Sequence, residues 1–215
     1  MRRKLFINGE IYHIFNKSIA NFNIFKDPNN CDRFLKILDY YNNPDPKISL
    51  SKQIFLKKEY DFKNILIPKE KSIIKYISYC IMPDHYHLLI KVLDQAKIYQ
   101  YLNNIGNSYT HFFNTKFERL GPLWQSGYKM VRVKNNEQLL HLSRYINLNP
   151  TTAGLVDKSE DWIFSSYRDL ITEKLFLNEL IKEISISNPE TYQKFVENNK
   201  DYQKKLKMIK KLKID

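Results

Sequence analysis

The sequence predicts an α+β domain with a ferredoxin-like split βαβ core, an antiparallel sheet and extra C-terminal helices. Three observations support this class. The chain has 215 residues, enough for one domain with a sizeable core. Hydrophobic residues make up 43% and charged residues 27%, which argues against a disordered chain. Segments with strand and helix patterns follow one another in the order β-α-β-β-α-β-α, which is the order of a split βαβ fold with one added helix.

The first strand is predicted over residues 9–18, where β-formers lie between Gly9 and Ser18. A helix follows over 30–42, because its apolar side chains recur every three or four residues. The Asn- and Pro-rich sequence that follows is typical of a turn and ends this helix. Residues 43–72 are therefore interpreted as a basic insertion without an assigned structure.

The middle of the chain predicts a hairpin and a long helix. Strands are expected over 74–82 and 85–92, joined by a turn or bulge at Pro83-Asp84. The most regular helical pattern covers 96–117. After Gly121-Pro122, residues 128–133 alternate apolar and basic side chains, as a fourth strand does.

A last core helix is expected over 137–148. Asn135 or Asn136 can cap its start, and Pro150 is expected to stop it. These elements place the domain at residues 1–175. The remainder, 176–215, is predicted to be a helical, Lys-rich extension.

Charge and cysteine content limit the function classes. Lys and Arg total 35 against 23 Asp and Glu, a net charge of +12 that favours polyanionic partners such as nucleic acid. A general Lys-rich composition explains the same excess equally well. Two distant cysteines exclude a disulfide scaffold and a four-cysteine zinc site, and indicate a reducing compartment. No signal peptide and no span of roughly 20 apolar residues is visible, so we expect a soluble cytoplasmic protein without a membrane partner.

Two histidines on the third predicted strand give the sharpest chemical signal. Residues i and i+2 of a strand share a face, so His85 and His87 should project side by side while Tyr86 and Leu88 enter the core. Adjacent neutral imidazoles suit a divalent cation, which then needs a third ligand from elsewhere. A His-x-His pair also occurs on strands without any function.

The last core helix carries a polar stripe. His141, Tyr145 and Asn149 are spaced four residues apart and stack along one side of a helix. From periodicity alone, Tyr145 could equally be a packing residue and Asn149 a C-terminal cap before Pro150.

Several motifs, in matching order, resemble the single-tyrosine HUH transposases, and among them the REP-associated and IS200-like tyrosine transposases. Met82-Pro83-Asp84-His85-Tyr86-His87-Leu88-Leu89 resembles the family's Met-Pro-Asn-His-x-His-Leu-Leu, and Arg144-Tyr145-Ile146-Asn147-Leu148-Asn149-Pro150 resembles its Arg-Tyr-Ile-x-x-Asn-Pro. Further similarities lie at 11–14, 121–125, 153–156 and 162–167. Two departures stand out: Asp84 where the family carries Asn, and Lys17 where it often carries Arg.

The resemblance implies a metal-dependent endonuclease and strand transferase acting on single-stranded, hairpin-bearing DNA. Tyr145 would be the nucleophile that forms a 5′-phosphotyrosine. His85, His87 and Asn149 would hold Mg²⁺ or Mn²⁺. His141, one turn before Tyr145, is a candidate proton relay from its spacing. Relatives act as monomers or as homodimers that supply the tyrosine in trans.

Contacts to DNA require cationic side chains and stacking rings outside the core. The candidates lie on loops, strand edges and the N-terminal arm: Arg2, Arg3, Lys4, Trp124, Gln125, Tyr128, Lys129, Arg132 and Lys134. Two alternative functions stay open at this point. One is a domesticated DNA-binding protein that keeps the fold without turnover, and the other is a single-strand nuclease that uses metal-activated water.

Overall fold

The computed structural model describes residues 5–57, 60, 64–67, 69–172, 186 and 188–199. Its sheet has four strands: β1 (Ile11–Lys17), β2 (Ile74–Met82), β3 (His85–Val92) and β4 (Lys129–Arg132). Their order is β2-β3-β1-β4 and every neighbouring pair is antiparallel. This arrangement confirms the predicted α+β class. Strands β2 and β3 begin and end where the sequence predicted, whereas β1 and β4 are shorter than expected.

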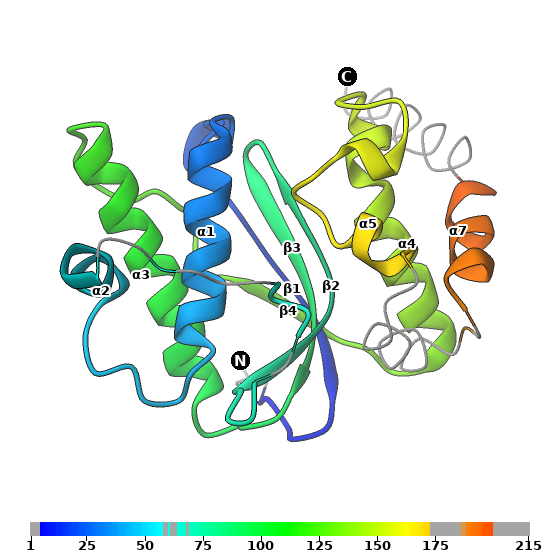
Figure 1. Cartoon of the computed structure of the whole chain (residues 1–215), viewed down its shortest axis with the longest axis horizontal. Helices are drawn as coiled ribbons and strands as arrows, with labels where there is room; N and C mark the ends of the chain where they lie inside the picture. The colour runs from blue at the N-terminus through cyan, green and yellow to red at the C-terminus, as the bar shows by residue number, and fades with distance from the viewer. Residues whose placement is uncertain are drawn as a thin grey trace.

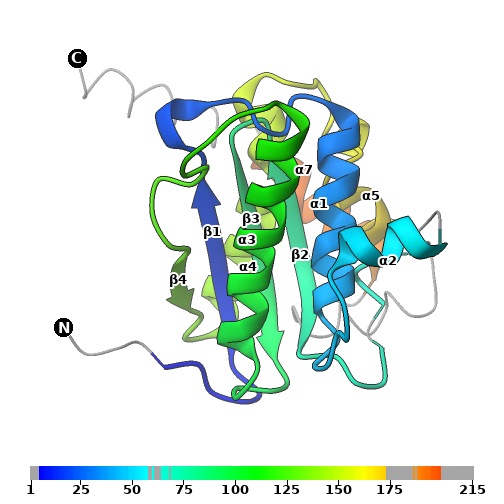
Figure 2. The ribbon, with the colours of Figure 1, turned by 90° about the vertical axis from the view of Figure 1, so that its left-hand side faces the viewer.

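Helices cover both faces of the sheet (Figure 1). On one face lie α1 (Pro28–Tyr41) and α3 (Ile98–Lys116), seen in front of the strands in Figure 2. On the other face lie α4 (Asn136–Ala153), α5 (Tyr167–Leu170) and α7 (Pro189–Glu197). Short 3₁₀ turns η1 (Ile19–Asn21) and η2 (Ser159–Asp161) complete the described elements. Within these ranges, no helix combines the length and apolar character that a bilayer crossing requires.

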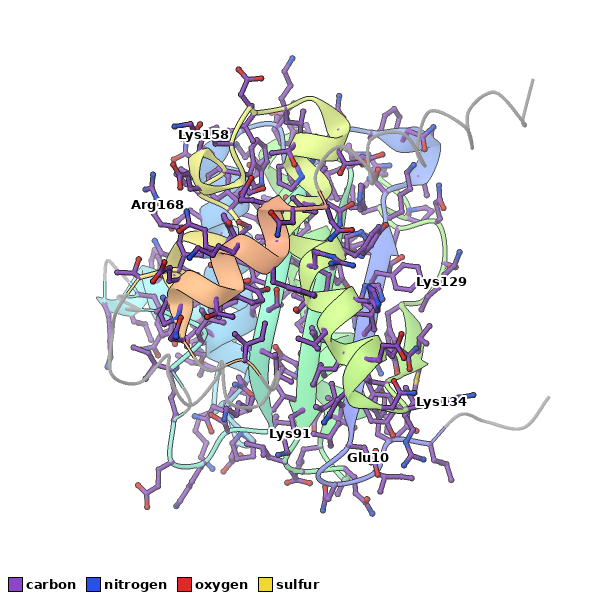
Figure 3. All side chains as sticks on the ribbon, turned by 90° about the vertical axis from the view of Figure 1, so that its right-hand side faces the viewer. Glu10, Lys91, Lys129, Lys134, Lys158 and Arg168 are labelled. Atoms are coloured by element: carbon purple, nitrogen blue, oxygen red, sulfur yellow. The ribbon has the colours of Figure 1, made fainter. Side chains whose placement is uncertain are left out.

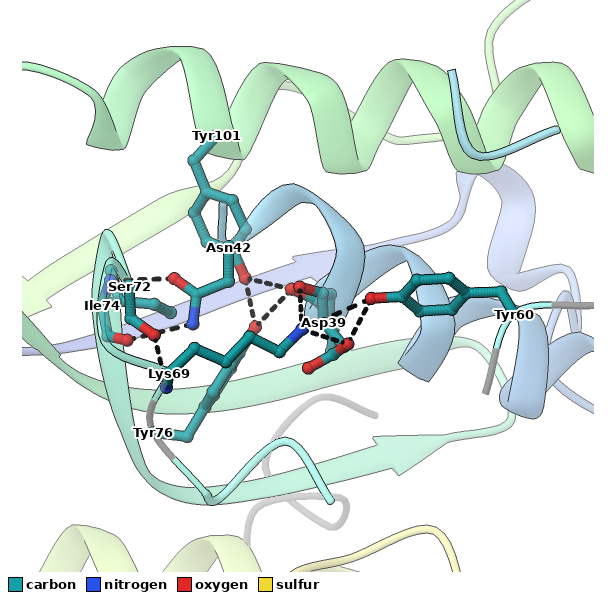
Figure 4. Close-up of polar contacts among 9 residues, drawn as sticks. Asp39, Asn42, Tyr60, Lys69, Ser72, Ile74, Tyr76 and Tyr101 are labelled. Carbon is teal, nitrogen blue, oxygen red and sulfur yellow. Dashed lines mark hydrogen bonds and ion pairs between the residues drawn. The ribbon is translucent and has the colours of Figure 1, made fainter. Parts of the chain in front are cut away.

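The insertion after α1 contains a helix, α2 (Leu50–Lys57), and is anchored by one buried carboxylate. Asp39 of α1 accepts hydrogen bonds from the Tyr60 hydroxyl at 2.5 Å and from the Lys69 ammonium at 2.6 Å (Figure 4). A buried charge is tolerated when it is paired and hydrogen-bonded in this way. Two residues of the insertion thus donate hydrogen bonds to a buried carboxylate of α1.

The prediction that Pro150 stops the last core helix is wrong. Helix α4 continues through Pro150 and ends at Gly154, which has φ +72° and is therefore suited to glycine. A proline removes the backbone donor that would bond the carbonyl four residues earlier. Here the Asn149 side-chain amide donates to that carbonyl, on Ile146, at 3.4 Å and to the Tyr145 carbonyl at 3.1 Å. The start of α4 is capped as predicted, since Asn135 accepts from the Gln138 backbone N–H.

A buried polar network fixes α4 against the sheet. The side-chain oxygen Oδ1 of Asn147 accepts hydrogen bonds from the Ser78 hydroxyl of β2 at 3.3 Å and from the Ser166 hydroxyl at 3.1 Å. Its amide donates to the Tyr192 hydroxyl of α7 at 2.7 Å. All four side chains are fully buried. The network therefore ties together β2, α4, α7 and the segment that leads into α5.

Replacing the centre of this network should destabilise the fold. Asn147→Ala leaves several buried polar groups without partners, and we expect a loss of about 2–4 kcal/mol in the free energy of unfolding. Urea denaturation followed by circular dichroism measures this change. Asn103→Ala, on the exposed side of α3, is the matched control and should shift the value by less than about 0.7 kcal/mol. Equal stability of both variants would contradict a structural role for the network.

Candidate active site

Strand β3 presents its two histidines to the face that α4 covers. The ring centroids of His85 and His87 are 5.0 Å apart, and both rings line one cavity. Tyr86 and Leu88 are buried on the opposite side, as the strand period predicted. The pairing of the two imidazoles is thus observed.

Each imidazole is held through its Nδ1 atom. His85 Nδ1 lies 2.5 Å from the Asp84 carboxylate, which also pairs with Lys17 at 3.2 Å. His87 Nδ1 lies 3.0 Å from Nε2 of His13, a buried residue of β1. The contact with His13 leaves the Nε2 atom of His87 for another partner. His87 Nε2 is buried and has no hydrogen-bond partner.

Helix α4 brings Tyr145 to the histidines of the same chain. The Tyr145 ring meets the His87 ring edge to face, with centroids 5.6 Å apart. The tyrosine is 42% exposed, so solvent or a ligand can reach it. Asn149 follows one turn later with its side chain buried and its amide nitrogen on the backbone carbonyls described above. The amide oxygen is then the Asn149 atom suited to a cation.

The histidines and the tyrosine share a cavity of about 220 Å³. Its walls come from β1, β3, the loop before β4, the start of β4, and α4. The lining residues are Phe15, Asn16, Lys17, His85, His87, Gln125, Ser126, Lys129 and Tyr145. Two lysines and two imidazoles give the cavity a lining suited to an anion such as a phosphate group.

Burial controls the protonation of the site. It lowers the pKa of His13 to about 4, and it lowers the pKa of His87 well below its usual value, with His85 and His13 adding to that effect. Burial also raises the pKa of Tyr145, and a hydrogen bond from Asn149 opposes the shift. The two buried imidazoles are therefore neutral at pH 7, and the phenol is protonated.

The donor set fits a hard-to-borderline divalent cation. Neutral imidazoles and an amide oxygen are ligands for Mn²⁺, and the unpartnered Nε2 of His87 is a buried donor atom in need of one. Among the residues that the structure describes, no group of three or more His, Cys, Asp or Glu side chains could hold a metal. A cation here would thus depend on the two imidazoles and on a further ligand; Asn149, the predicted one, is not among the residues that line the cavity.

The predicted DNA contacts occupy different environments. Gln125 and Lys129 line the cavity, and Lys134 is exposed farther along the same edge as Lys129 (Figure 3). Arg132 is paired with Glu10 at 2.6 Å. Arg2, Arg3 and Lys4 lie outside the described residues.

The two aromatic candidates pack mainly against protein. Trp124 donates its indole N–H to the Gly106 carbonyl at 3.3 Å, and its ring contacts Phe25, Phe34, Tyr86 and Tyr109. Tyr128 is partly buried next to Phe6. Stacking of bases on these rings stays a prediction, with less free ring surface than the sequence suggested.

His141 lies on an exposed face of α4 and is not among the residues that line the cavity. Its Nδ1 is 2.7 Å from Arg144, and its Nε2 is 3.8 Å from Glu137. His141 thus has partners on α4 itself, and its role as a proton relay stays a prediction.

Sequence reasoning missed the contribution of β1. His13, Phe15 and Lys17 alternate along this strand and surround the histidine pair, and Asn16 and Ser126 also line the cavity. The antiparallel register sets Phe15 opposite His87 and Lys17 opposite His85. The period-two pattern of residues 13, 15 and 17 was the available signal, but the β1–β3 pairing was needed to interpret it.

Comparisons with known proteins agree with this fold. The model of the family described as transposase IS200-like matches residues 50–149, a range that includes both histidines, Tyr145 and Asn149. A curated relative, the putative REP-associated tyrosine transposase of Haemophilus influenzae, is 27% identical over 108 residues. That match covers 45% of this chain and 61% of the relative.

A solved structure of a REP-associated tyrosine transposase bound to a REP hairpin has a similar fold. The TM-score is 0.57 with 15% identity, over 80% of this chain and 86% of the other. Together the comparisons confirm the resemblance to the IS200-like and REP-associated tyrosine transposases, and the solved structure confirms the fold.

Acid should destabilise the protein through the buried imidazoles. Unfolded histidine binds a proton below about pH 6.5, whereas folded His13 does so only near pH 4. The contribution of neutral His13 to the free energy of unfolding is therefore fully present above pH 6.5. It is lost as the pH falls toward 4, by roughly 3 kcal/mol in total. In metal-free buffer, the free energy of unfolding of His13→Gln should fall less steeply across this window. The exposed His111→Gln should behave as wild type, and parallel curves for all three proteins would contradict the assignment.

Proposed function

We infer that this chain, which resembles the IS200-like and REP-associated tyrosine transposases in sequence and in fold, is a DNA transposase that cuts and rejoins single-stranded DNA. The observation that carries the proposal is the position of Tyr145. Its ring meets the His87 ring edge to face across a cavity lined with cationic side chains. One cavity is therefore lined by a nucleophilic side chain, by the imidazoles proposed as cation ligands and by the lysines proposed to bind phosphate.

In the proposed reaction, the Tyr145 oxygen attacks the phosphorus of a phosphodiester. The bond from phosphorus to the 3′ oxygen breaks, leaving a 5′-phosphotyrosine and a free 3′-hydroxyl. The phenol proton must leave during the attack, because a phenol is protonated at neutral pH and burial raises the pKa of Tyr145 further. Attack by a second 3′-hydroxyl reverses the chemistry and joins strands without an external energy source.

His85, His87 and Asn149 would hold Mg²⁺ or Mn²⁺ in this proposal. The cation would supply charge neutralisation on the non-bridging phosphate oxygens. The protein's own contribution is orientation: Asp84 and His13 hold the two imidazoles, while the backbone carbonyls of α4 hold Asn149. Lys17 and Lys129 would bind the phosphates on either side.

The cavity supports a single-stranded substrate. In this proposal, the cavity of about 220 Å³ receives one phosphate group of the strand. Lys129 and Lys134 lie along one edge of the molecule beside α4, whereas Lys158 and Arg168 lie at the opposite edge (Figure 3). We propose that the strand follows the Lys129–Lys134 edge. Because the similar solved structure is a complex with a hairpin, a hairpin-bearing DNA is the substrate to try first.

The tyrosine is proposed to act in cis. Tyr145 meets the histidines of its own chain, and the Asn147 network ties α4 to β2 of the same chain. Exchange of α4 between two copies would require breaking these buried hydrogen bonds.

Tyr145→Phe should abolish a covalent protein–DNA adduct. Phenylalanine keeps the ring contact with His87 but lacks the attacking oxygen. Labelled hairpin-bearing single-stranded oligonucleotides with Mn²⁺, analysed on a denaturing gel, would reveal the adduct as a band at protein mass. The control Tyr99→Phe, on an exposed surface of α3, should retain it. Cleavage that survives Tyr145→Phe would identify a nuclease that uses water, and specific hairpin binding by wild type without any cleavage would identify a DNA-binding protein without turnover.

Mixing two inactive variants tests the cis arrangement. Tyr145→Phe lacks the nucleophile, and His87→Ala lacks a proposed cation ligand. If the tyrosine acts in cis, an equimolar mixture should form less than about 5% of the wild-type adduct, because no subunit contains both groups. Recovery to about a quarter of wild type or more would show that tyrosine and histidines come from different chains.

A further inference from the structure

We propose that His13 is a positioning residue that sets the tautomer of His87, so that the Nε2 atom of His87 is free of hydrogen and able to bind a divalent cation. The inference rests on the proposed function and adds to it a residue from β1. It starts from two observations. His13 Nε2 and His87 Nδ1 are 3.0 Å apart, and His87 Nε2 is buried without a partner.

The contact has two forms when both imidazoles are neutral. In the first, His87 Nδ1–H donates to His13 Nε2, and His87 Nε2 carries a lone pair. In the second, His13 Nε2–H donates to His87 Nδ1, and His87 Nε2 carries a hydrogen. Only the first form can bind a cation through Nε2. In the second form, a buried N–H donor has no acceptor, which is unfavourable.

The surroundings hold His13 in place for this contact. Both rings are buried, with 6% of each residue exposed, so water does not compete for the hydrogen bond. Phe15 stacks on His13 with centroids 4.9 Å apart and an interplanar angle of 27°. The antiparallel register sets His13 opposite Leu89, two residues beyond His87, which is the diagonal arrangement that lets ring side chains meet.

The two imidazoles thus have different supports. His85 has a carboxylate, Asp84, whereas His87 has only the neutral His13 ring. A neutral acceptor orients a ligand without adding a charge to the buried part of the site. Loss of such an orienting partner typically weakens metal binding 10- to 100-fold.

Mn²⁺ binding to the full chain, measured by electron paramagnetic resonance, tests the inference with two variants. His13→Phe keeps a ring against Phe15 but has no acceptor, and should raise the Kd for Mn²⁺ about 10- to 100-fold. His13→Gln supplies an amide oxygen as acceptor and should stay within about threefold of wild type. Thermal denaturation checks that both variants fold. Binding by His13→Phe within threefold of wild type would overturn the inference.

Imidazole ¹⁵N NMR gives a readout that a purely structural role would not move. In the Mg²⁺-saturated wild type, His87 should carry its hydrogen on Nδ1, and His13→Phe should show a larger Nε2–H fraction in metal-free protein. Hydrogen on His87 Nε2 in the Mg²⁺-saturated wild type would overturn the inference even if His13→Phe failed to fold.

The adduct assay separates failure of the inference about His13 from failure of the proposed function. A wild type that binds Mn²⁺ but forms no adduct contradicts the function alone, whereas an active wild type with an unaltered His13→Phe contradicts only the role of His13.

Discussion

The site depends on α4 being fixed across the face of the sheet opposite α1 and α3. Tyr145 and the histidine pair belong to separate elements, and nothing in the local sequence of either brings them together. The Asn147 side chain provides the link, because it is bonded to β2, to the residue before α5 and to α7 at once. These bonds fix the rotation of α4 about its axis. Tyr145 lies two residues, or about half a turn, before Asn147, and at this rotation its ring contacts His87 of β3.

The passage of α4 through Pro150 serves the same arrangement. A helix that stopped before the proline would leave Asn149 at a frayed end, with its side chain unplaced. Instead the Asn149 amide bonds the carbonyl that the proline leaves without a donor, and this bond orients the side chain within the helix. One residue thus repairs the helix and presents an oxygen one turn beyond Tyr145. The sequence prediction is wrong here because the Asn149 amide compensates for the usual effect of proline.

Much of the fold could be predicted from sequence, because the strand and helix periods are clean. Strands β2 and β3 have their expected limits, and the i, i+2 spacing placed His85 and His87 side by side. Apart from the local compensation at Pro150, the parts that could not be predicted depend on contacts between distant segments. The contact between His13 and His87 requires the β1–β3 register, and the partly buried position of Trp124 requires its packing against α1 and α3. The pairing of Asp39 with Tyr60 and Lys69 requires the return of the insertion onto α1.

The structure brings together the two residues that depart from the sequence motifs of the similar family. Asp84 and Lys17 form an ion pair at 3.2 Å. The charge that Asp84 adds beside His85 is therefore balanced locally. Although burial raises the pKa of Asp84, its hydrogen bonds to His85 and Lys17 outweigh that effect and lower it. An ionised Asp84 can only accept, so His85 must donate from Nδ1. A carboxylate in this position thus fixes which His85 nitrogen carries the hydrogen, and the ion pair with Lys17 offsets the added charge.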